Sequence, residues 1–216
     1  VRIPAAAVEL AGDLVLPEDA FGIVLFAHGS GSGKGSPRNR AVAAFLHEAG
    51  LATLLVDLLT EEEAAIDDST AEHRFDIDLL AERVGKAAEW LAAAPETRQL
   101  AQGYYGASTG AAAALVAAAE HPELARAVVS RGGRPDLADA ALPRVQSPTL
   151  LIVGGDDTTV LDLNRRALAA MHCRKKLEII PGATHLFPEP GAMSAVSRLA
   201  RRWFVEHLGV PGASNS

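Results

Sequence analysis

A serine flanked by small residues is the clearest sign of chemistry in this chain. Ser108 lies in the run Gly106-Ala107-Ser108-Thr109-Gly110, where an extended segment, QLAQGYY, meets an alanine-rich helical one. A serine on a sharp strand-to-helix turn has a strained backbone, so its neighbours two positions away must lack bulk. Its hydroxyl then lies beside the free N–H groups of a helix N-terminus, which can stabilise an oxyanion. The run therefore predicts a nucleophile elbow and acyl chemistry.

A serine nucleophile needs a base to take its proton and a carboxylate to orient that base. Asp156 and Asp157 directly follow the extended run TLLIV, and His185 follows LEII through the loop PGAT. The order serine, aspartate, histidine is that of the α/β-hydrolases, with separations of 49 residues (157 − 108) and 28 residues (185 − 157). We expect His185 to be the base and one of the two aspartates to orient it.

The other six histidines are weaker candidates for the base. His28 follows an extended run but precedes Gly29, in a loop better suited to presenting backbone N–H groups. The remaining five lie in or beside helical segments, where surface placement or ordinary packing is expected: His47, His73, His121, His172 and His207.

Extended apolar runs alternate with helical patterns along the chain, which predicts an α/β fold with a mostly parallel sheet and helices on both faces. The expected strands are 6–16 (one strand or a hairpin, interrupted at Gly12 and Asp13), 23–27, 51–56, 99–105, 125–129, 149–153 and 177–180. The expected helices are 41–49, 77–91 and 111–120, with two more centred near Leu168 and Leu199.

Two connections in this pattern bear on the site. Residues 57–74 are polar and acidic, and we expect a surface connection whose charges form a solvated face: Glu61, Glu62, Glu63, Asp67 and Asp68. Between residues 129 and 149 there are too few residues for a helical cap domain, so a capless, open site is predicted.

Composition narrows the class of protein. A chain of 216 residues fits one domain, and we expect it to cover 1–210, followed by a flexible tail at 211–216. The net charge of −7 argues against a nucleic-acid partner. The lack of a long apolar run or a basic-apolar leader argues against a membrane or export, and the single cysteine, Cys173, favours a cytoplasmic location. Whether the chain, which begins with Val1, was excised from a longer protein stays open.

Neither a cofactor nor a metal is expected. The loop HGSGSGKGS is similar to the phosphate-binding pattern G-x-x-x-x-G-K-[ST], but His28 stands where the first glycine belongs and Gly35 replaces the hydroxyl residue. His172 and Cys173 are adjacent and have no partners at metal-ligand spacing.

Together these motifs resemble the dienelactone hydrolase-like branch of the α/β-hydrolases over nearly the whole chain. The resemblance rests on G-A-S-T-G, on H-G-S upstream, and on G-G-D-D and G-A-T-H downstream. Similarity to the family pattern G-x-x-D-x-x-V implies that Asp157 orients the base, while Asp156 caps the next helix. Similarity to the H-G-x motif implies that the backbone N–H of Ser30 forms one half of the oxyanion hole, and Thr109, the residue immediately after the nucleophile, is expected to supply the other N–H.

Two departures from the family affect the expected substrate. Dienelactone hydrolases use a cysteine nucleophile and carry an arginine four residues after the histidine, where this chain has Ser108 and Glu189. Arg131 and Arg134 could bind a substrate carboxylate instead, although we first expect pairing with Asp136 or Asp139. The resemblance favours a serine carboxylesterase for small-molecule esters of small or medium acyl groups.

Several alternatives remain open at this stage. Lactone or dienelactone-type hydrolysis and acyl transfer share the same acyl-enzyme, and a non-catalytic binding module could use the same scaffold. Related domains also occur fused to phosphoribosyltransferase domains. The natural substrate, its acyl-chain length and the oligomeric state are not determined by the sequence.

Overall fold

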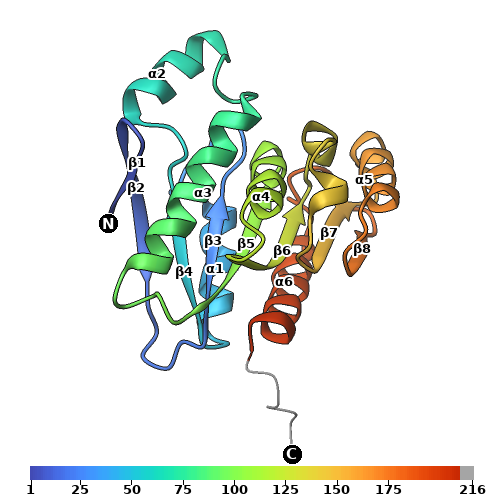
Figure 1. Ribbon diagram of the computed structural model, residues 1–216. Coiled ribbons are helices and arrows are strands. Elements are labelled where there is room, and N and C mark those ends of the chain that lie inside the picture. Colours follow the sequence, from blue (N-terminus) through green and yellow to red (C-terminus); the bar gives the residue numbers. More distant parts are fainter. Residues whose placement is uncertain (210–216) are drawn as a thin grey trace, which may run out of the picture.

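The computed structural model describes residues 1–209, which form one eight-stranded sheet (Figure 1). The strands lie in the order β1-β2-β4-β3-β5-β6-β7-β8; β1 and β2 are antiparallel to their neighbours and the others are parallel. The strands are β1 (Arg2–Ala5), β2 (Val8–Val15), β3 (Gly22–Ala27), β4 (Leu51–Val56), β5 (Ala101–Ala107), β6 (Ala125–Arg131), β7 (Thr149–Gly154) and β8 (Lys175–Ile180).

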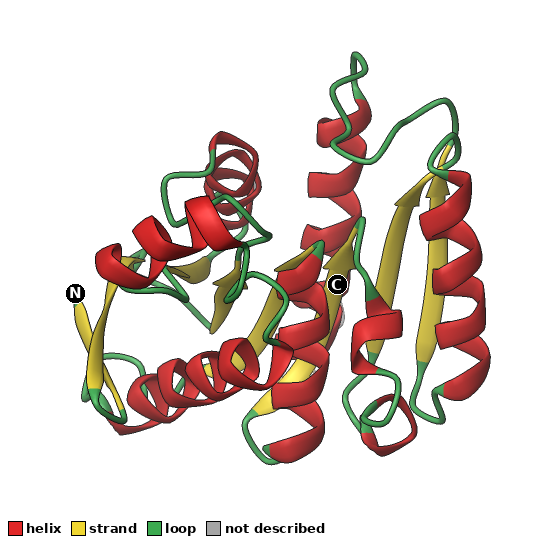
Figure 2. Cartoon of the chain, turned by 90° about the horizontal axis from the view of Figure 1, so that it is seen from above, coloured by secondary structure: helices red, strands yellow, loops and turns green. Residues whose placement is uncertain are grey.

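Helices cover both faces of the sheet, as the alternating pattern predicted (Figure 2). Helices α3, α4 and α5 lie on one face, and α1 and α6 pack together on the other. The helices are α1 (Pro37–His47), α2 (Glu61–Thr70), α3 (Ile77–Ala93), α4 (Thr109–Glu120), α5 (Thr158–Ala170) and α6 (Ala192–Leu208), with short 3₁₀ helices η1 (Pro135–Ala138) and η2 (Leu142–Arg144). The predicted α/β fold is therefore confirmed.

Two hydrophobic cores, one on each face of the sheet, hold these layers together. Successive side chains of a strand point to opposite faces, so Leu25 and Tyr104 lie in one core while Phe26 and Tyr105 lie in the other. Helix α4 is buried on nearly every side and is rich in alanine, whose small side chain allows close packing.

Three local expectations need correction. The N-terminal hairpin turns at Ala6 and Ala7, and β2 runs straight through Gly12. Residues 57–74 do lie largely at the surface, but they contain α2, which was not expected. Strand β6 extends to Arg131, which places this residue at the end of a strand and not in the following loop.

The carboxyl ends of the parallel strands carry the loops that hold the candidate site, which is where open α/β sheets bind ligands. Between β6 and β7 the chain forms only the two 3₁₀ helices, in keeping with the predicted absence of a cap domain at this connection. No helix within residues 1–209 is both long and apolar enough to cross a bilayer. The predicted tail, 211–216, lies outside the described residues.

Candidate active site

Ser108 lies on the sharp turn between β5 and α4 with a backbone that few non-glycine residues adopt. Its φ is 51° and its ψ is −119°. A Cβ atom on Gly106 would overlap the backbone of Ala111, and one on Gly110 would overlap the carbonyl oxygens at the end of β3. The glycines on either side are thus required by the close approach of neighbouring backbone, as the sequence pattern predicted.

The loop after β3 lies directly against the start of α4. The hydroxyl groups of Ser30 and Thr109 are 3.0 Å apart and share a hydrogen bond. Among the hydrogen bonds of residues 1–209, none uses the backbone N–H of Ser30 or of Thr109. Free N–H donors beside a helix N-terminus are able to hold an oxyanion.

His28 fixes this loop in place. Its Nε2 accepts a hydrogen bond of 2.9 Å from the N–H of Leu58, and its Nδ1–H donates to the carbonyl of Gly29, also at 2.9 Å. Burial lowers the pKa of His28, although the Gly29 carbonyl and the Asp57 carboxylate act in the opposite direction. A neutral His28 thereby ties the loop after β3 to the end of β4.

His185 and Asp157 come from the loops after β8 and β7 and are hydrogen-bonded to each other. The Nδ1–H of His185 donates to Asp157 Oδ2 at 2.7 Å, and the aspartate side chain is 14% exposed. A Cβ on Gly154 would overlap the carbonyl of Ala183, so this glycine allows the two loops to approach. The geometry leaves the other nitrogen of His185 available for proton transfer.

The Asp156 side chain forms no hydrogen bond or ion pair with His185, whose carboxylate partner is Asp157. Its backbone N–H donates to the carbonyl of Ala183 at 3.0 Å, and the residue is exposed. The expectation that Asp156 caps the next helix was wrong: Asp157 occupies the N-cap position of α5 and makes no side-chain capping bond there. Its carboxylate is instead used by His185.

Glu189 holds the loop that presents His185, a role that the sequence analysis missed. Its Oε1 accepts hydrogen bonds from the N–H of Thr184 at 3.0 Å and from the Thr184 hydroxyl at 2.6 Å. The bond from the Thr184 hydroxyl lowers the pKa of Glu189, so the anchor is a carboxylate. The sequence sign of this anchor was the presence of Thr184 and Glu189 on either side of the candidate base, five residues apart.

A cavity of about 220 Å³ brings several of the predicted residues together. Ser108, His185 and Ser30 all line it, and so does Arg131. The structure thus places the candidate nucleophile, the candidate base and one candidate oxyanion residue around a common space.

Arg131 is a buried cation without a carboxylate partner among residues 1–209. The residue is 5% exposed, its Nη2 lies 3.4 Å from Asn39 Oδ1, and its guanidinium carbon lies 5.9 Å from the centre of the Phe187 ring. Its Nε is buried and has no hydrogen-bond partner in the described chain. The expected pairing with Asp136 or Asp139 is therefore wrong for Arg131.

Arg134 has the carboxylate partner that was expected. It forms a bidentate pair with Asp136, with Nη2–Oδ2 and Nε–Oδ1 distances of 2.8 and 2.9 Å. The bond to Asp136 raises the pKa of the Arg134 guanidinium. Arg134 does not line the cavity that contains Ser108.

Helix α2 forms the wall of a second, larger cavity of about 320 Å³ on the other side of Ser30. The expected solvated face was correct for the exposed Glu61, Glu62 and Asp68 but wrong for two other carboxylates. Glu63 closes a capping box with Thr60 and pairs with Arg83 at 2.9 Å. Asp67 is buried.

The buried Asp67 fastens the end of α2 to the segment that follows it. Its carboxylate accepts from the N–H groups of His73 and Arg74, both at 2.8 Å, and from Nε of Arg74 at 2.9 Å. Burial alone would raise the pKa of Asp67, but these donors outweigh it and hold the pKa below its usual range. The carbonyl of Arg74 in turn accepts from the Ser30 hydroxyl at 3.4 Å.

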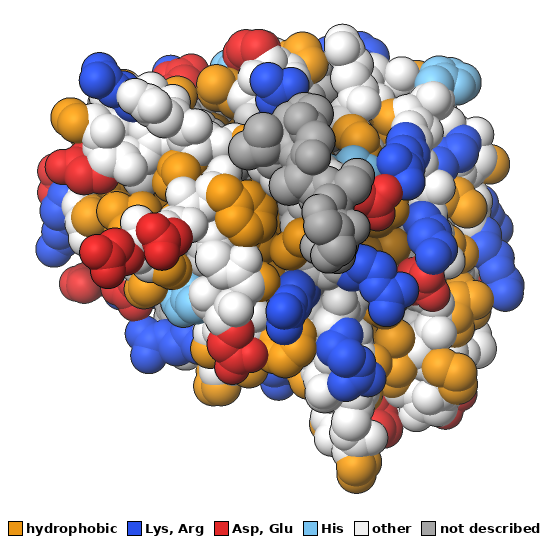
Figure 3. Space-filling view, turned by 90° about the horizontal axis from the view of Figure 1, so that it is seen from below, with side chains coloured by type: hydrophobic (Ala, Val, Ile, Leu, Met, Phe, Trp, Pro, Cys, Tyr) orange, Lys and Arg blue, Asp and Glu red, His pale blue; other side chains and the backbone are white. Residues whose placement is uncertain are grey.

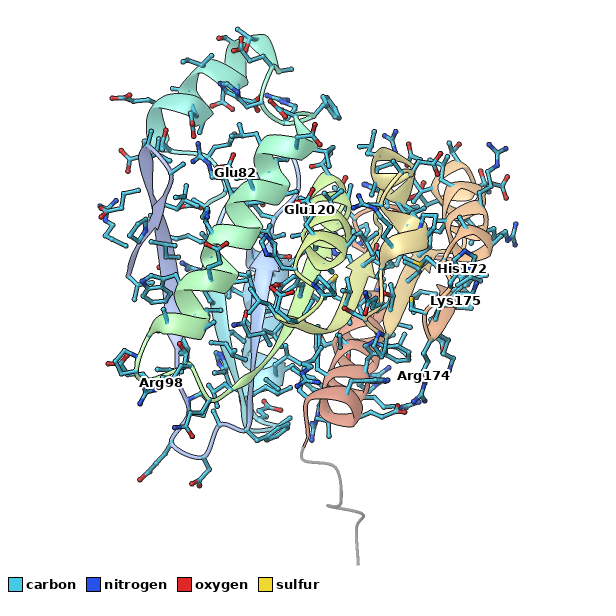
Figure 4. The ribbon with its side chains drawn as sticks, in the orientation of Figure 1. Glu82, Arg98, Glu120, His172, Arg174 and Lys175 are labelled. Atoms are coloured by element: carbon cyan, nitrogen blue, oxygen red, sulfur yellow. The ribbon has the colours of Figure 1, made fainter. Side chains whose placement is uncertain are left out.

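Clusters of polar and charged side chains also lie away from the two cavities. His172, Arg174 and Lys175 lie near the start of the edge strand β8 (Figure 4), and residues 1–209 contain no group of three or more His, Cys, Asp or Glu side chains placed to bind a metal. A groove between α1 and α6 is lined by Phe45 and several arginines. From below, Lys and Arg side chains gather over the end of the molecule where α6 ends (Figure 3).

The sheet order and the strained serine after β5 define the class of protein as an α/β-hydrolase. The model of the dienelactone hydrolase family matches residues 10–205, and the chain belongs to this family. It is therefore a hydrolase by family.

Similar proteins support this assignment. A crystal structure described as dienelactone hydrolase from Anabaena variabilis is 59% identical, has a TM-score of 0.95, and is matched over 96% of each chain. Est1E from Butyrivibrio proteoclasticus, in a complex with ferulic acid, is 15% identical with a TM-score of 0.82 over 97% of this chain and all of that one, which shows the fold alone.

A longer curated relative also matches. A Mycobacterium tuberculosis protein that carries the provisional name phosphoribosyl transferase is 55% identical over 214 residues, which is 99% of this chain. The match covers 47% of the relative, so the chain spans about half the length of the curated relatives it matches.

Proposed function

We propose that this chain is a serine carboxylesterase that forms an acyl-enzyme on Ser108. The observation that carries the proposal is the 2.7 Å hydrogen bond between His185 and Asp157, in a histidine that shares a cavity with the strained Ser108. A carboxylate on Nδ1 orients the imidazole so that Nε2 is free to accept the serine proton.

The proposed reaction has two halves. Ser108 Oγ attacks the ester carbonyl carbon while its proton moves to His185 Nε2, and the N–H groups of Ser30 and Thr109 hold the resulting oxyanion. The C–O bond to the alcohol then breaks, and the alcohol leaves with the proton from His185. Water attacks the acyl-enzyme with the same histidine as base, which releases the acid and restores Ser108. These steps need no cofactor.

The size of the site supports small or medium acyl groups. The two cavities of about 220 and 320 Å³ meet at the loop after β3, and no cap domain is inserted between β6 and β7 to enlarge them. A lactone is an internal ester and would react by the same steps, with its alcohol remaining attached to the acyl group. Acyl transfer would also use the same acyl-enzyme and would differ only in the acceptor that replaces water.

We further propose that Arg131 binds a negatively charged group of the substrate beside the reacting ester. A buried guanidinium without a carboxylate partner favours an anion that enters the same cavity. Arg134, whose charge is taken up by Asp136, is not proposed for this role. The family's arginine after the histidine is absent here, since Glu189 occupies that position and anchors Thr184.

The provisional name of the curated relatives refers to a different reaction. Phosphoribosyl transfer is named for a protein about twice as long, and we assign that name to the part of those relatives beyond the match. The hydrolase chemistry is assigned to the matched half.

Hydrolysis of 4-nitrophenyl acetate tests the proposed function. Ser108→Ala removes the nucleophile and should lower kcat/KM by at least about 10³-fold. Ser194→Ala is a matched control because Ser194 is exposed on α6 and lines neither of the two cavities; it should retain the wild-type rate. Turnover by purified, folded Ser108→Ala at the wild-type rate would contradict the proposal.

A further inference from the structure

The two cavities that meet at the loop after β3 carry opposite charges. They share Gly29, Ser30 and Ser32 as a common border. The described residues that line the smaller cavity include two arginines, Arg38 and Arg131, and no carboxylate. The larger cavity has four carboxylates and a single arginine in its lining: Asp57, Glu61, Asp67, Asp68 and Arg74.

Two of those four carboxylates are neutralised by neighbouring cations. Asp57 pairs with Lys34 at 3.0 Å, and Asp67 pairs with Arg74 at 2.9 Å. Glu61 and Asp68 are exposed and form no ion pair within residues 1–209. Their negative charges therefore act on whatever enters the larger cavity, whose remaining lining includes apolar side chains: Leu59, Ala64 and Leu80.

The wall that carries these charges is anchored at both ends. Thr60 and Glu63 close a capping box at the start of α2, and Glu63 also pairs with the buried Arg83 of α3. At the other end, Asp67 holds Arg74. Glu61 and Asp68 are thus held at the rim by a fixed helix and not by a free loop, so they present a lasting negative potential.

The position of His185 orients the ester between the cavities. In the proposed function, on which this inference rests, His185 gives its proton to the leaving alcohol. His185 lines the smaller cavity and not the larger one, so the alcohol half must lie on the smaller side. With the oxyanion directed at Ser30 and Thr109, the acyl half is left to extend past Thr109 into the larger cavity, which Thr109 lines.

We propose that the larger cavity is the acyl pocket and that it selects uncharged or cationic acyl groups against anionic ones. Glu61 and Asp68 are the specificity-determining residues, because they are the unpaired charges of the described lining. An acyl group with a terminal carboxylate would be placed beside two like charges, whereas a trimethylammonium group would be attracted to them.

Three 4-nitrophenyl esters with a common leaving group test the proposal. Their acyl groups are the neutral 5,5-dimethylhexanoyl, its cationic isostere 4-(trimethylammonio)butanoyl, and the anionic 5-carboxypentanoyl group of an adipic acid monoester. Each kcat/KM is divided by the hydroxide-catalysed rate of the same ester, which removes differences in intrinsic reactivity. We expect the cationic ester to exceed the anionic one by about tenfold, because each exposed charge contributes modestly.

Substitution of Glu61 and Asp68 tests whether these two residues cause the charge preference. The double variant Glu61→Gln/Asp68→Asn should bring the three normalised rates within about twofold, as should high salt for wild type. Glu62→Gln removes a neighbouring exposed charge of α2 that does not line the cavity, and should keep the wild-type preference.

The outcomes separate this proposal from the function on which it rests. Turnover of all three esters without charge preference, or a preference unchanged in the double variant, would overturn the acyl pocket and leave the esterase intact. If none of the esters is hydrolysed and a fluorophosphonate does not label Ser108, the esterase proposal fails and the acyl pocket fails with it.

Discussion

The two cavities beside Ser30 are built in different ways. The smaller one is formed by loops at the ends of the parallel strands β3, β5, β6 and β8, where the sheet itself fixes each side chain. The larger one has α2 as its wall, and α2 stands above the ends of β1, β2 and β4, outside the layered core (Figure 1). Its attachment depends on ion pairs and caps.

This difference separates chemistry from selection. The candidate nucleophile and base border the smaller cavity, so changes there should act mainly on kcat. Changes in the α2 wall should act on substrate preference and on stability. Substitutions on the two sides of Ser30 can test this division directly.

The largest effect is expected from Asp157. Asp157→Asn removes the charge that orients His185 and should lower kcat by about 10³- to 10⁴-fold with little change in KM. Asp156→Asn is the adjacent control, since Asp156 is exposed and its side chain forms no hydrogen bond or ion pair with the histidine; it should stay within about twofold of wild type. Equal losses in the two variants would break the assignment.

Arg131 gives the next effect, on the alcohol side of the ester. Arg131→Gln should lower kcat/KM for 3-acetoxybenzoate by about 10- to 100-fold, the range of a charged hydrogen bond, and change that for neutral 3-acetoxybenzamide much less. Arg131→Lys keeps the charge and should retain part of the preference for the anionic ester. It provides the test if the glutamine variant is unstable. Arg134→Gln serves as the paired control. A loss that is the same for both esters would argue for a structural role alone.

His28 provides the smallest effect, on stability against pH. Burial lowers the pKa of His28 in the folded state. Once the pH falls below the ordinary histidine value of 6.5, the unfolded chain therefore binds a proton at this residue that the folded chain does not bind. Stability is thus fully present above that pH and declines as the pH falls toward the lowered pKa. Urea unfolding at pH 7.5 and 5.0 should show this decline in wild type.

The variant His28→Gln isolates that contribution. It should be less stable at pH 7.5, since the bonds to Leu58 and Gly29 are disturbed, and should lose less stability than wild type on going to pH 5.0. His47, whose pKa is also lowered by burial, stays in place and keeps part of the decline. Parallel losses in both proteins would show that His28 does not carry this pH dependence.

Many residues that line the smaller cavity could be predicted from the sequence, because short motifs and the strand order determine their positions. Glycines at 106 and 110 around Ser108 signal close backbone approach, and loops after parallel strands meet at one edge of the sheet. The choice between Arg131 and Arg134 was not readable. Arg131 is the last residue of β6, whereas Arg134 lies in the connection that follows and pairs there with Asp136. Their spacing in the sequence does not show where the strand ends.

The larger cavity was largely missed for a physical reason. Helix α2 has no apolar stripe, and the one residue it buries is Asp67, so hydrophobic periodicity gave no signal. Its stability comes from contacts distant in sequence, such as that of Glu63 with Arg83. The capping box formed by Thr60 and Glu63 was the local sign that could have predicted a helix here.

Covalent labelling is the sharpest test of whether Ser108 is the nucleophile. Wild-type protein treated with a fluorophosphonate should gain the mass of one phosphonyl group, which peptide mass spectrometry should place on Ser108, and a hydrolysable ester should slow the labelling. Ser108→Ala, shown to be folded by circular dichroism, should gain none. Folded wild-type protein that hydrolyses esters without a label on Ser108, or that is labelled on another residue instead, would show that Ser108 is not the nucleophile.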